Sequence, residues 1–221
     1  MGENMAEALI GAIQKFSWIL LIAILLFGWT SPVLMVVAFI CMIAPVVFSF
    51  SSGRAWCGNF CPRNSFSNVI LSKISPNKHI PKFYKSAAFR LLMFILLMSL
   101  FGASIYSAHG SLKGIGYTFL KMMLITTIMQ ISFGVFIHPN IWCSFCPMGT
   151  AASVITKFRK NDDMNIKISK SCIDCGICKN NCPLELDISK WKSEGEVKDG
   201  NCMKCRKCIK SCPQRALTWN E

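Results

Sequence analysis

Apolar residues are gathered into four long stretches in the first two thirds of the chain, separated by short polar segments. A helix that crosses a membrane needs roughly 20 mostly apolar residues, because the hydrocarbon layer is about 30 Å thick. Such stretches run over about Ile13–Trp29, Val33–Phe50, Ala87–Tyr106 and Gly116–Ile137. The pattern therefore predicts a membrane all-α four-helix bundle at the N-terminal side.

The composition changes after about residue 161. No Asp or Glu lies between Glu7 and Asp162, whereas residues 162–221 hold nine of the eleven acidic residues and eight of the thirteen cysteines. We therefore predict two domains. Residues 1–161 form a four-span membrane domain with two cysteine-pair motifs, and residues 162–221 form a small cysteine-rich tail.

Lysine and arginine are concentrated between the second and third apolar stretches. Seven lie there: Arg54, Arg63, Lys73, Lys78, Lys82, Lys85 and Arg90. Basic loops are retained on the cytoplasmic side of a membrane, so we predict a multi-pass protein of the cell inner (cytoplasmic) membrane, surrounded by the lipid bilayer, with both termini in the cytoplasm. The net charge of +13 reflects these loops and does not indicate nucleic acid as a partner.

The tail contains the spacing C-x2-C-x2-C-x3-C-P twice. In this motif three cysteines bind one [4Fe-4S] cluster, while the fourth, before proline, reaches the other cluster. The predicted ligands of one cluster are Cys172, Cys175, Cys178 and Cys212, and those of the second are Cys202, Cys205, Cys208 and Cys182. Zinc sites use paired cysteine hooks, and disulfides need an oxidising compartment, so two iron–sulfur clusters are the predicted cofactors.

The tail resembles bacterial-type two-cluster ferredoxins over about residues 166–217. The resemblance implies a C-terminal α+β domain of pseudo-symmetric fold that holds both clusters close together. Four basic residues lie among the ligands: Lys204, Arg206, Lys207 and Lys210. They either stabilise a reduced cluster or dock an acidic partner, and the sequence does not separate these roles.

A second cysteine motif follows each pair of apolar stretches. The chain reads Trp-Cys-Gly-Asn-Phe-Cys-Pro at residues 56–62 and Trp-Cys-Ser-Phe-Cys-Pro at residues 142–147. Because both preceding helices run in the same direction, an internal repeat would place both pairs on the cytoplasmic face. The four cysteines, here called the membrane-edge cysteines, are Cys57, Cys61, Cys143 and Cys146. They are predicted metal ligands, with a third iron–sulfur cluster as the leading interpretation.

Other interpretations of the membrane-edge cysteines stay open. They could bind copper or zinc, act as redox-active thiol pairs, or be free thiols packed at an interface. Each Cys-Pro is expected to begin a helix at the membrane surface, and the positive end of that helix would lower the pKa of the thiols. Cys41 is predicted to be structural.

Histidines are too few and too scattered for a b-type haem, which needs two facing each other within the bundle. They are His79, His109 and His138. Electrons are therefore expected to move through iron–sulfur centres. If a quinol binds, His138 is the best placed proton acceptor, although a hydrogen-bonded histidine at the membrane interface is the simpler interpretation.

With the membrane-edge pairs placed ahead of two cluster motifs, the chain resembles the membrane polyferredoxins that include the NapH subunit of periplasmic nitrate reductase systems, MauN of methylamine utilisation and the C-terminal half of NosR. The second pair departs from that group, since it is C-x2-C-P instead of C-x3-C-P. The resemblance implies an electron-transfer subunit of a larger oxidoreductase complex, which is not catalytic alone.

That role would connect a membrane donor or acceptor, such as the quinone pool or a partner membrane subunit, with another membrane or peripheral redox subunit. The alternative is a copper-handling or other metal-handling assembly factor that uses the membrane-edge cysteines.

Overall fold

The structure is a computed structural model that describes residues 2–108, 111–158 and 165–219. Four long helices dominate it: α1 (Gly2–Phe27), α2 (Pro32–Ser52), α7 (Ala87–Ser107) and α8 (Leu112–Phe136). Each contains a segment long and apolar enough to cross a membrane, which confirms the four predicted stretches. His109 and the predicted domain boundary between residues 161 and 162 lie outside the described residues.

The first helix begins well before the predicted start at Ile13. Its N-terminal turns include Glu3 and Glu7, a residue type that favours a helix without being apolar. The hydrophobic pattern locates only the part that can cross the hydrocarbon layer, and this part runs over Ala8–Phe27.

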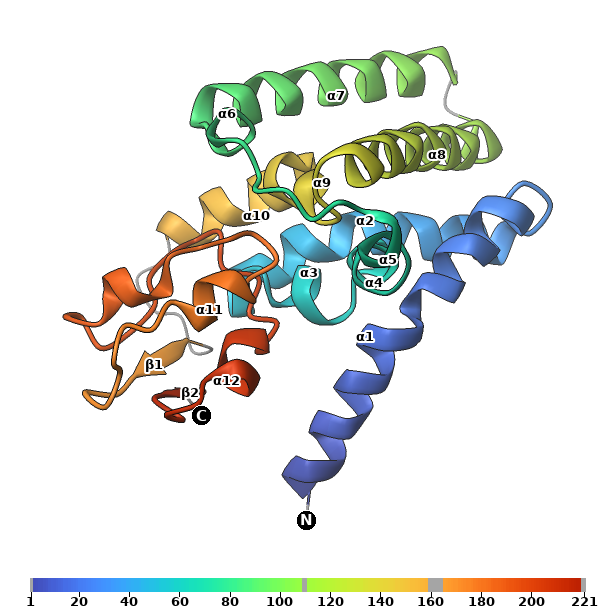
Figure 1. The fold of residues 1–221 in the computed structure, drawn as a ribbon. Coiled ribbons are helices and arrows are strands. Elements are labelled where there is room, and N and C mark those ends of the chain that lie inside the picture. The colour runs from blue at the N-terminus through green and yellow to red at the C-terminus, as the bar shows by residue number, and fades with distance from the viewer. Residues whose placement is uncertain (1, 109–110, 159–164, 220–221) are drawn as a thin grey trace.

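The long helices are arranged as an open group (Figure 1). Helices α2 and α8 pack against each other, α1 packs on both, and α7 packs on α8. Only 11% of the span in α7 is buried, compared with 44% of that in α8. Most of the apolar surface of α7 is therefore available to lipid or to another membrane protein.

Short helices follow each pair of spans. After α2 come α3 (Ala55–Asn59), α4 (Pro62–Phe66), a π-helical turn η1 (Ser67–Leu71) and α5 (Ser72–Ile74). After α8 come α9 (Ile141–Phe145) and α10 (Pro147–Phe158). A further short helix, α6 (Lys82–Lys85), lies just before α7. The helix predicted after each Cys-Pro is thus present, although a π-helical turn interrupts the first.

The tail combines short helices with a small sheet. Strand β1 (Ile166–Ile168) pairs antiparallel with β2 (Leu217–Trp219), so the two ends of the tail lie together. Helices α11 (Ile177–Asn180) and α12 (Lys207–Ser211) pack on each other, and a 3-10 helix η2 (Ile188–Trp191) lies between them in sequence. Ile166, Ile188 and Leu217 form a core with several tail cysteines.

Candidate metal centres

The two tail motifs follow the same backbone path. Each has three residues at positive φ in equivalent positions: Asp174, Gly176 and Glu185 in the first, and Lys204, Arg206 and Arg215 in the second. Positive φ is uncommon for residues other than glycine and is found where surrounding structure imposes it. The same pattern of positive φ in both motifs indicates that both loops turn their cysteines toward the interior of the tail.

The tail cysteines line two separate cavities. One is lined by Cys172, Cys175, Cys178 and Cys212. The other is lined by Cys182, Cys202, Cys205 and Cys208. These are the crossed groups of four that the spacing predicts, three from one motif and one from the other. Cluster binding itself stays a prediction for both groups.

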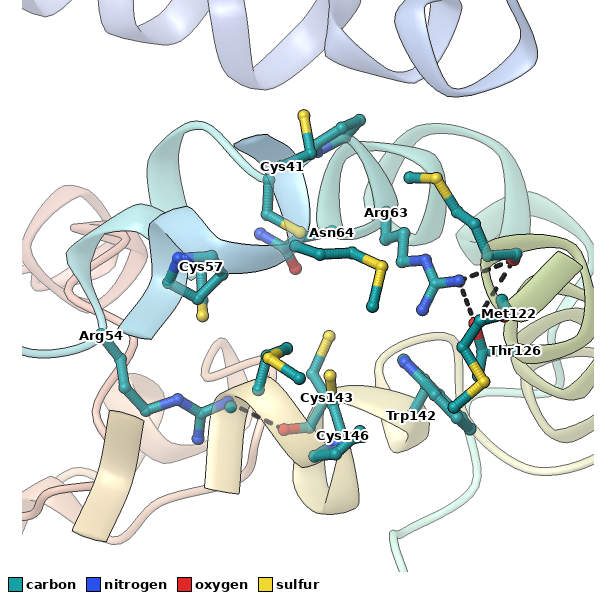
Figure 2. A pocket seen from close by; sticks show the side chains of 18 of the residues that line it. Cys41, Arg54, Cys57, Arg63, Asn64, Met122, Thr126, Trp142, Cys143 and Cys146 are labelled. Carbon is teal, nitrogen blue, oxygen red and sulfur yellow. Dashed lines mark hydrogen bonds between the residues drawn. The ribbon is translucent and has the colours of Figure 1, made fainter. Parts of the chain in front are cut away.

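The four membrane-edge cysteines line a third cavity, bounded by the middle of α2 and of α8 and by the short helices α3, α4, α9 and α10 (Figure 2). Its empty volume is about 790 Å³, against about 430 Å³ and about 360 Å³ for the two tail cavities. Within the described ranges, no group of three or more His, Cys, Asp and Glu side chains is arranged to hold a metal ion directly.

Burial raises the pKa values of the Cys57, Cys61 and Cys143 thiols, contrary to the prediction that helix ends lower them. The pKa of Cys57 rises to about 12, and that of Cys143 rises further, chiefly through burial. At Cys61 the backbone N–H groups of Asn64 and Arg63 lower the pKa, but burial outweighs them. The prediction was wrong because loss of water disfavours a thiolate more than a short helix favours it.

Two arginines, Arg54 buried and Arg63 half-buried, lie on opposite sides of the cysteine cavity (Figure 2). Arg54 is only 1% exposed and donates from Nη2 to the carbonyl of Cys143 at 2.9 Å. Arg63 donates to the carbonyl of Met123 at 2.8 Å and to two threonine hydroxyls. All these partners are neutral, and no carboxylate pairs with either guanidinium among the residues that the structure describes.

Buried charges are normally paired, because removing them from water is costly. The Nε atoms of both arginines, together with Nε1 of Trp142, are buried without a hydrogen-bond partner. These donors surround sulfurs that become negatively charged when they bind a metal. The site therefore fits an anionic iron–sulfur or metal–thiolate group, whose sulfur atoms would accept these hydrogen bonds.

Three residues line the cavity although the sequence did not assign them to this site. Arg54 and Arg63 indicated only the orientation of the chain in the membrane, and Cys41 is the cysteine predicted to be structural. Both arginines lie beside cysteines in a stretch without acidic residues, and this pattern could have indicated that they belong to the site.

The second tail motif lies directly against the membrane-edge cysteines. Cys57 and Cys143 form a packed cluster with Leu184, Met203 and the predicted ligand Cys182. A Cβ added at Gly58 would lie 2.1 Å from the carbonyl oxygen of Met203. The tail therefore docks through the second cysteine loop and the end of the first motif.

Two of the four basic residues near the tail ligands face the membrane domain. Lys207 donates to the side-chain oxygen of Asn68 at 2.7 Å, and the buried Lys204 lies near Gly53, which ends α2. Lys204 and Lys207 thus approach the membrane domain of the same chain, and the two roles predicted for the basic residues stay predictions.

A family model matches two segments of the membrane domain. Residues 34–81 and 119–164 match the family of 4Fe-4S binding domains. The two matched segments contain all four membrane-edge cysteines and end before the first tail cysteine, Cys172. The match therefore concerns the repeated membrane motif, independently of the two motifs in the tail.

Three relatives were found among curated proteins. An uncharacterised protein of Methanocaldococcus jannaschii is 24% identical over 80% of this chain and 69% of its own length. A second from the same organism is 24% identical over 81% of this chain and 77% of its own. YccM of Escherichia coli K12, provisionally named an electron transport protein, is 26% identical over 80% of this chain but only 53% of YccM. The narrower resemblance to NapH, MauN and NosR is not tested by these relatives. No solved structure matches the chain significantly.

The crossed ligand sets predict how iron is lost from paired cysteine variants. Cys172→Ala with Cys212→Ala removes two ligands of one cluster, so we expect a loss of about four iron atoms per chain. Cys172→Ala with Cys182→Ala removes one ligand from each cluster, so about eight should be lost. Equal losses from the two double variants, measured as iron per purified chain, would show that the ligand sets are wrong.

The close approach at Gly58 predicts that Gly58→Ala weakens tail docking. The added methyl meets backbone, so we expect a loss of about 1–3 kcal/mol, as for other overpacked sites. Hydrogen exchange of amides in residues 202–208 should therefore accelerate. Gly102→Ala is the matched control, because nothing lies within 4 Å of its added Cβ. Unchanged exchange in Gly58→Ala would contradict the docking contact.

Proposed function

We propose that this chain is a membrane-anchored iron–sulfur electron-transfer subunit. In this proposal the tail holds two [4Fe-4S] clusters and the membrane-edge cysteines hold a third iron–sulfur cluster. The observation that carries it is the shared cavity of Cys57, Cys61, Cys143 and Cys146, flanked by Arg54 and Arg63 without carboxylate partners. Each cluster, when bound, would accept and release one electron.

Contacts between the cysteine groups suggest the order of the centres. Cys57 and Cys143 pack against Cys182, a predicted ligand of the second tail cluster. The other tail group contains the exposed Cys175, and Ile173 nearby in the same loop is 61% exposed. We infer that electrons pass between the membrane edge and a redox partner that docks near Cys175.

The membrane end of this route is proposed to meet the quinone pool or a partner membrane subunit. The cysteine cavity extends between the spans, since Met42 of α2, Met98 of α7 and Met122 of α8 line it. The largely unburied spans offer surface for further subunits, which supports a role within a larger oxidoreductase complex. The basic segment between α2 and α7 supports the orientation with both termini in the cytoplasm.

A quinol that reduces the protein gives up two electrons and two protons, so a proton acceptor is needed. His138 accepts a hydrogen bond at Nδ1 from the backbone N–H of Asn140 at 3.2 Å, and burial lowers its pKa. His79 instead pairs with Glu185 at 2.9 Å and has an exposed side chain. Neither histidine lines the cysteine cavity.

A second function, copper handling, is favoured by the lining of the same cavity. Besides the four membrane-edge cysteines, the soft sulfur donors Cys41, Met42, Met98, Met122, Met123 and Met148 line it. Thiolate and thioether sulfurs favour Cu(I). The same cavity could therefore serve an assembly factor, and metal analysis separates the two functions.

Metal content per chain tests the proposal. With a third cubane the protein should contain about 12 iron atoms, and the double variant Cys57→Ser with Cys61→Ser should retain about eight. Cys41→Ser is the control, because Cys41 lines the cavity but lies outside the paired motif, and it should keep about 12. A parent protein with about eight iron atoms would refute the third cubane, and copper bound there only in the parent would favour metal handling.

The quinone connection is tested by rapid mixing. The reduced protein, in membranes with its natural partners, should be oxidised by a quinone, which restores the visible absorbance of the clusters. The Cys57→Ser and Cys61→Ser double variant should react more slowly, because the membrane end of the route is removed while the tail remains. Equal rates for both proteins would contradict entry through the membrane edge.

A further inference from the structure

A separate cavity lies between the membrane domain and the tail. Arg54, Lys85, Arg90 and Ser144 of the membrane domain line it together with Asn201 of the tail. It shares only Arg54 with the cysteine cavity. We call it the basic cavity, because three of its lining residues are cationic.

The positive charges of the basic cavity are incompletely balanced. Arg54 is almost fully buried and Arg90 is half-buried, so water screens the repulsion between their like charges only weakly. Two acids lie nearby in the described part of the chain. Glu185 accepts from Lys85 at 2.8 Å and also binds His79 and the backbone N–H of Ile80.

The other nearby acid is Asp199, which accepts at 2.9 Å from both the backbone and the side-chain nitrogen of Asn201. Arg90 in turn donates to the side-chain oxygen of Asn201 at 2.6 Å. Neither Asp199 nor Glu185 lines the basic cavity. The lining of the basic cavity therefore includes three cationic side chains and neither of these two carboxylates.

Two polar atoms of residues that line only the basic cavity have no partner. Arg90 Nε and Ser144 Oγ are buried and make no hydrogen bond, and Ser144 is only 7% exposed. Buried donors are nearly always satisfied in folded proteins. Water could accept these bonds but would not offset the repulsion between the guanidinium groups, whereas an anion with several oxygens does both.

We propose that the basic cavity binds a phosphate-type oxyanion, which accepts hydrogen bonds from Arg90 and Ser144, while Arg54 adds positive charge to the cavity wall. The oxyanion is either inorganic phosphate or the phosphodiester of an anionic phospholipid. Arg90 lies in the first turn of α7, close to the start of the span at Ala87. That is the level of lipid phosphates if α7 crosses the membrane. The ligand would join the membrane domain to the tail, and this proposal does not rest on the proposed function.

The test measures ligand binding to the purified, cluster-loaded protein. Radiolabelled inorganic phosphate is added at constant ionic strength in one arm. In the other, protein exposed to vesicles of phosphatidylglycerol or phosphatidylcholine is examined by native mass spectrometry for retained lipid. We expect saturable phosphate binding or retention of phosphatidylglycerol over phosphatidylcholine, and the responding arm identifies the source.

Variants connect the binding to the basic cavity. Arg90→Gln should weaken binding by about tenfold or more, because it removes a charged hydrogen bond. Ser144→Ala should weaken it less and keeps the proposal testable if Arg90→Gln does not fold. Lys82→Gln, in the same basic segment but outside the cavity, should bind like the parent. Iron content is measured for each variant as a check on folding.

Three results would overturn the proposal. They are no binding of either probe to the parent, parent-like binding by both Arg90→Gln and Ser144→Ala, or equal competition by chloride and phosphate at the same site. The last result would show that charge alone, without an oxyanion's several acceptors, accounts for binding.

Discussion

A positive charge buried away from water needs an anion close by, and between Ala8 and Asn161 this chain has no carboxylate to supply one. Arg54 is nevertheless buried and Arg63 half-buried beside four cysteines, and their hydrogen bonds go to carbonyls and hydroxyls. Burial raises the pKa values of the Cys57 and Cys143 thiols. A metal group bound to the cysteines would convert the thiols into thiolates and would supply the missing negative charge.

The contacts that dock the tail on the membrane domain lie next to the same cysteines. Gly58, next to Cys57, allows the carbonyl of Met203 to approach the membrane-edge loop, and Arg54 also reaches the carbonyl of Asn201 at 3.3 Å. The arginine that lies beside the cysteine cavity thus also holds the start of the second tail motif. A change in charge at the membrane edge would be felt directly at the second group of tail cysteines.

Much of this organisation could be predicted from the sequence. The apolar stretches gave the four long helices, since length and hydropathy decide which helices can cross a membrane. The cysteine spacing anticipated the two groups of four in the tail, because a fixed spacing on a turning loop limits which sulfurs can meet. The placement of both membrane-edge pairs in one cavity followed from the repeat of two helices and a cysteine pair.

The remaining features depend on contacts between residues far apart in the chain. Arg54 meets Asn201, and Glu185 reaches His79 and Lys85, so neither role could be inferred from neighbouring sequence. Cys41 enters the cavity only because α2 packs on α8 and brings that face inward. The pKa of Cys61 depended on how completely the site is buried, which a helix position alone does not reveal.

The central claim is that a redox centre at the membrane edge lies in contact with the second tail cluster. The most direct measurement is the EPR spectrum of the fully reduced protein, compared with that of the Cys57→Ser and Cys61→Ser double variant at equal tail iron. The account predicts a signal split or broadened by a neighbouring paramagnetic centre in the parent, and a simpler signal in the variant. Identical spectra from the two proteins would contradict it.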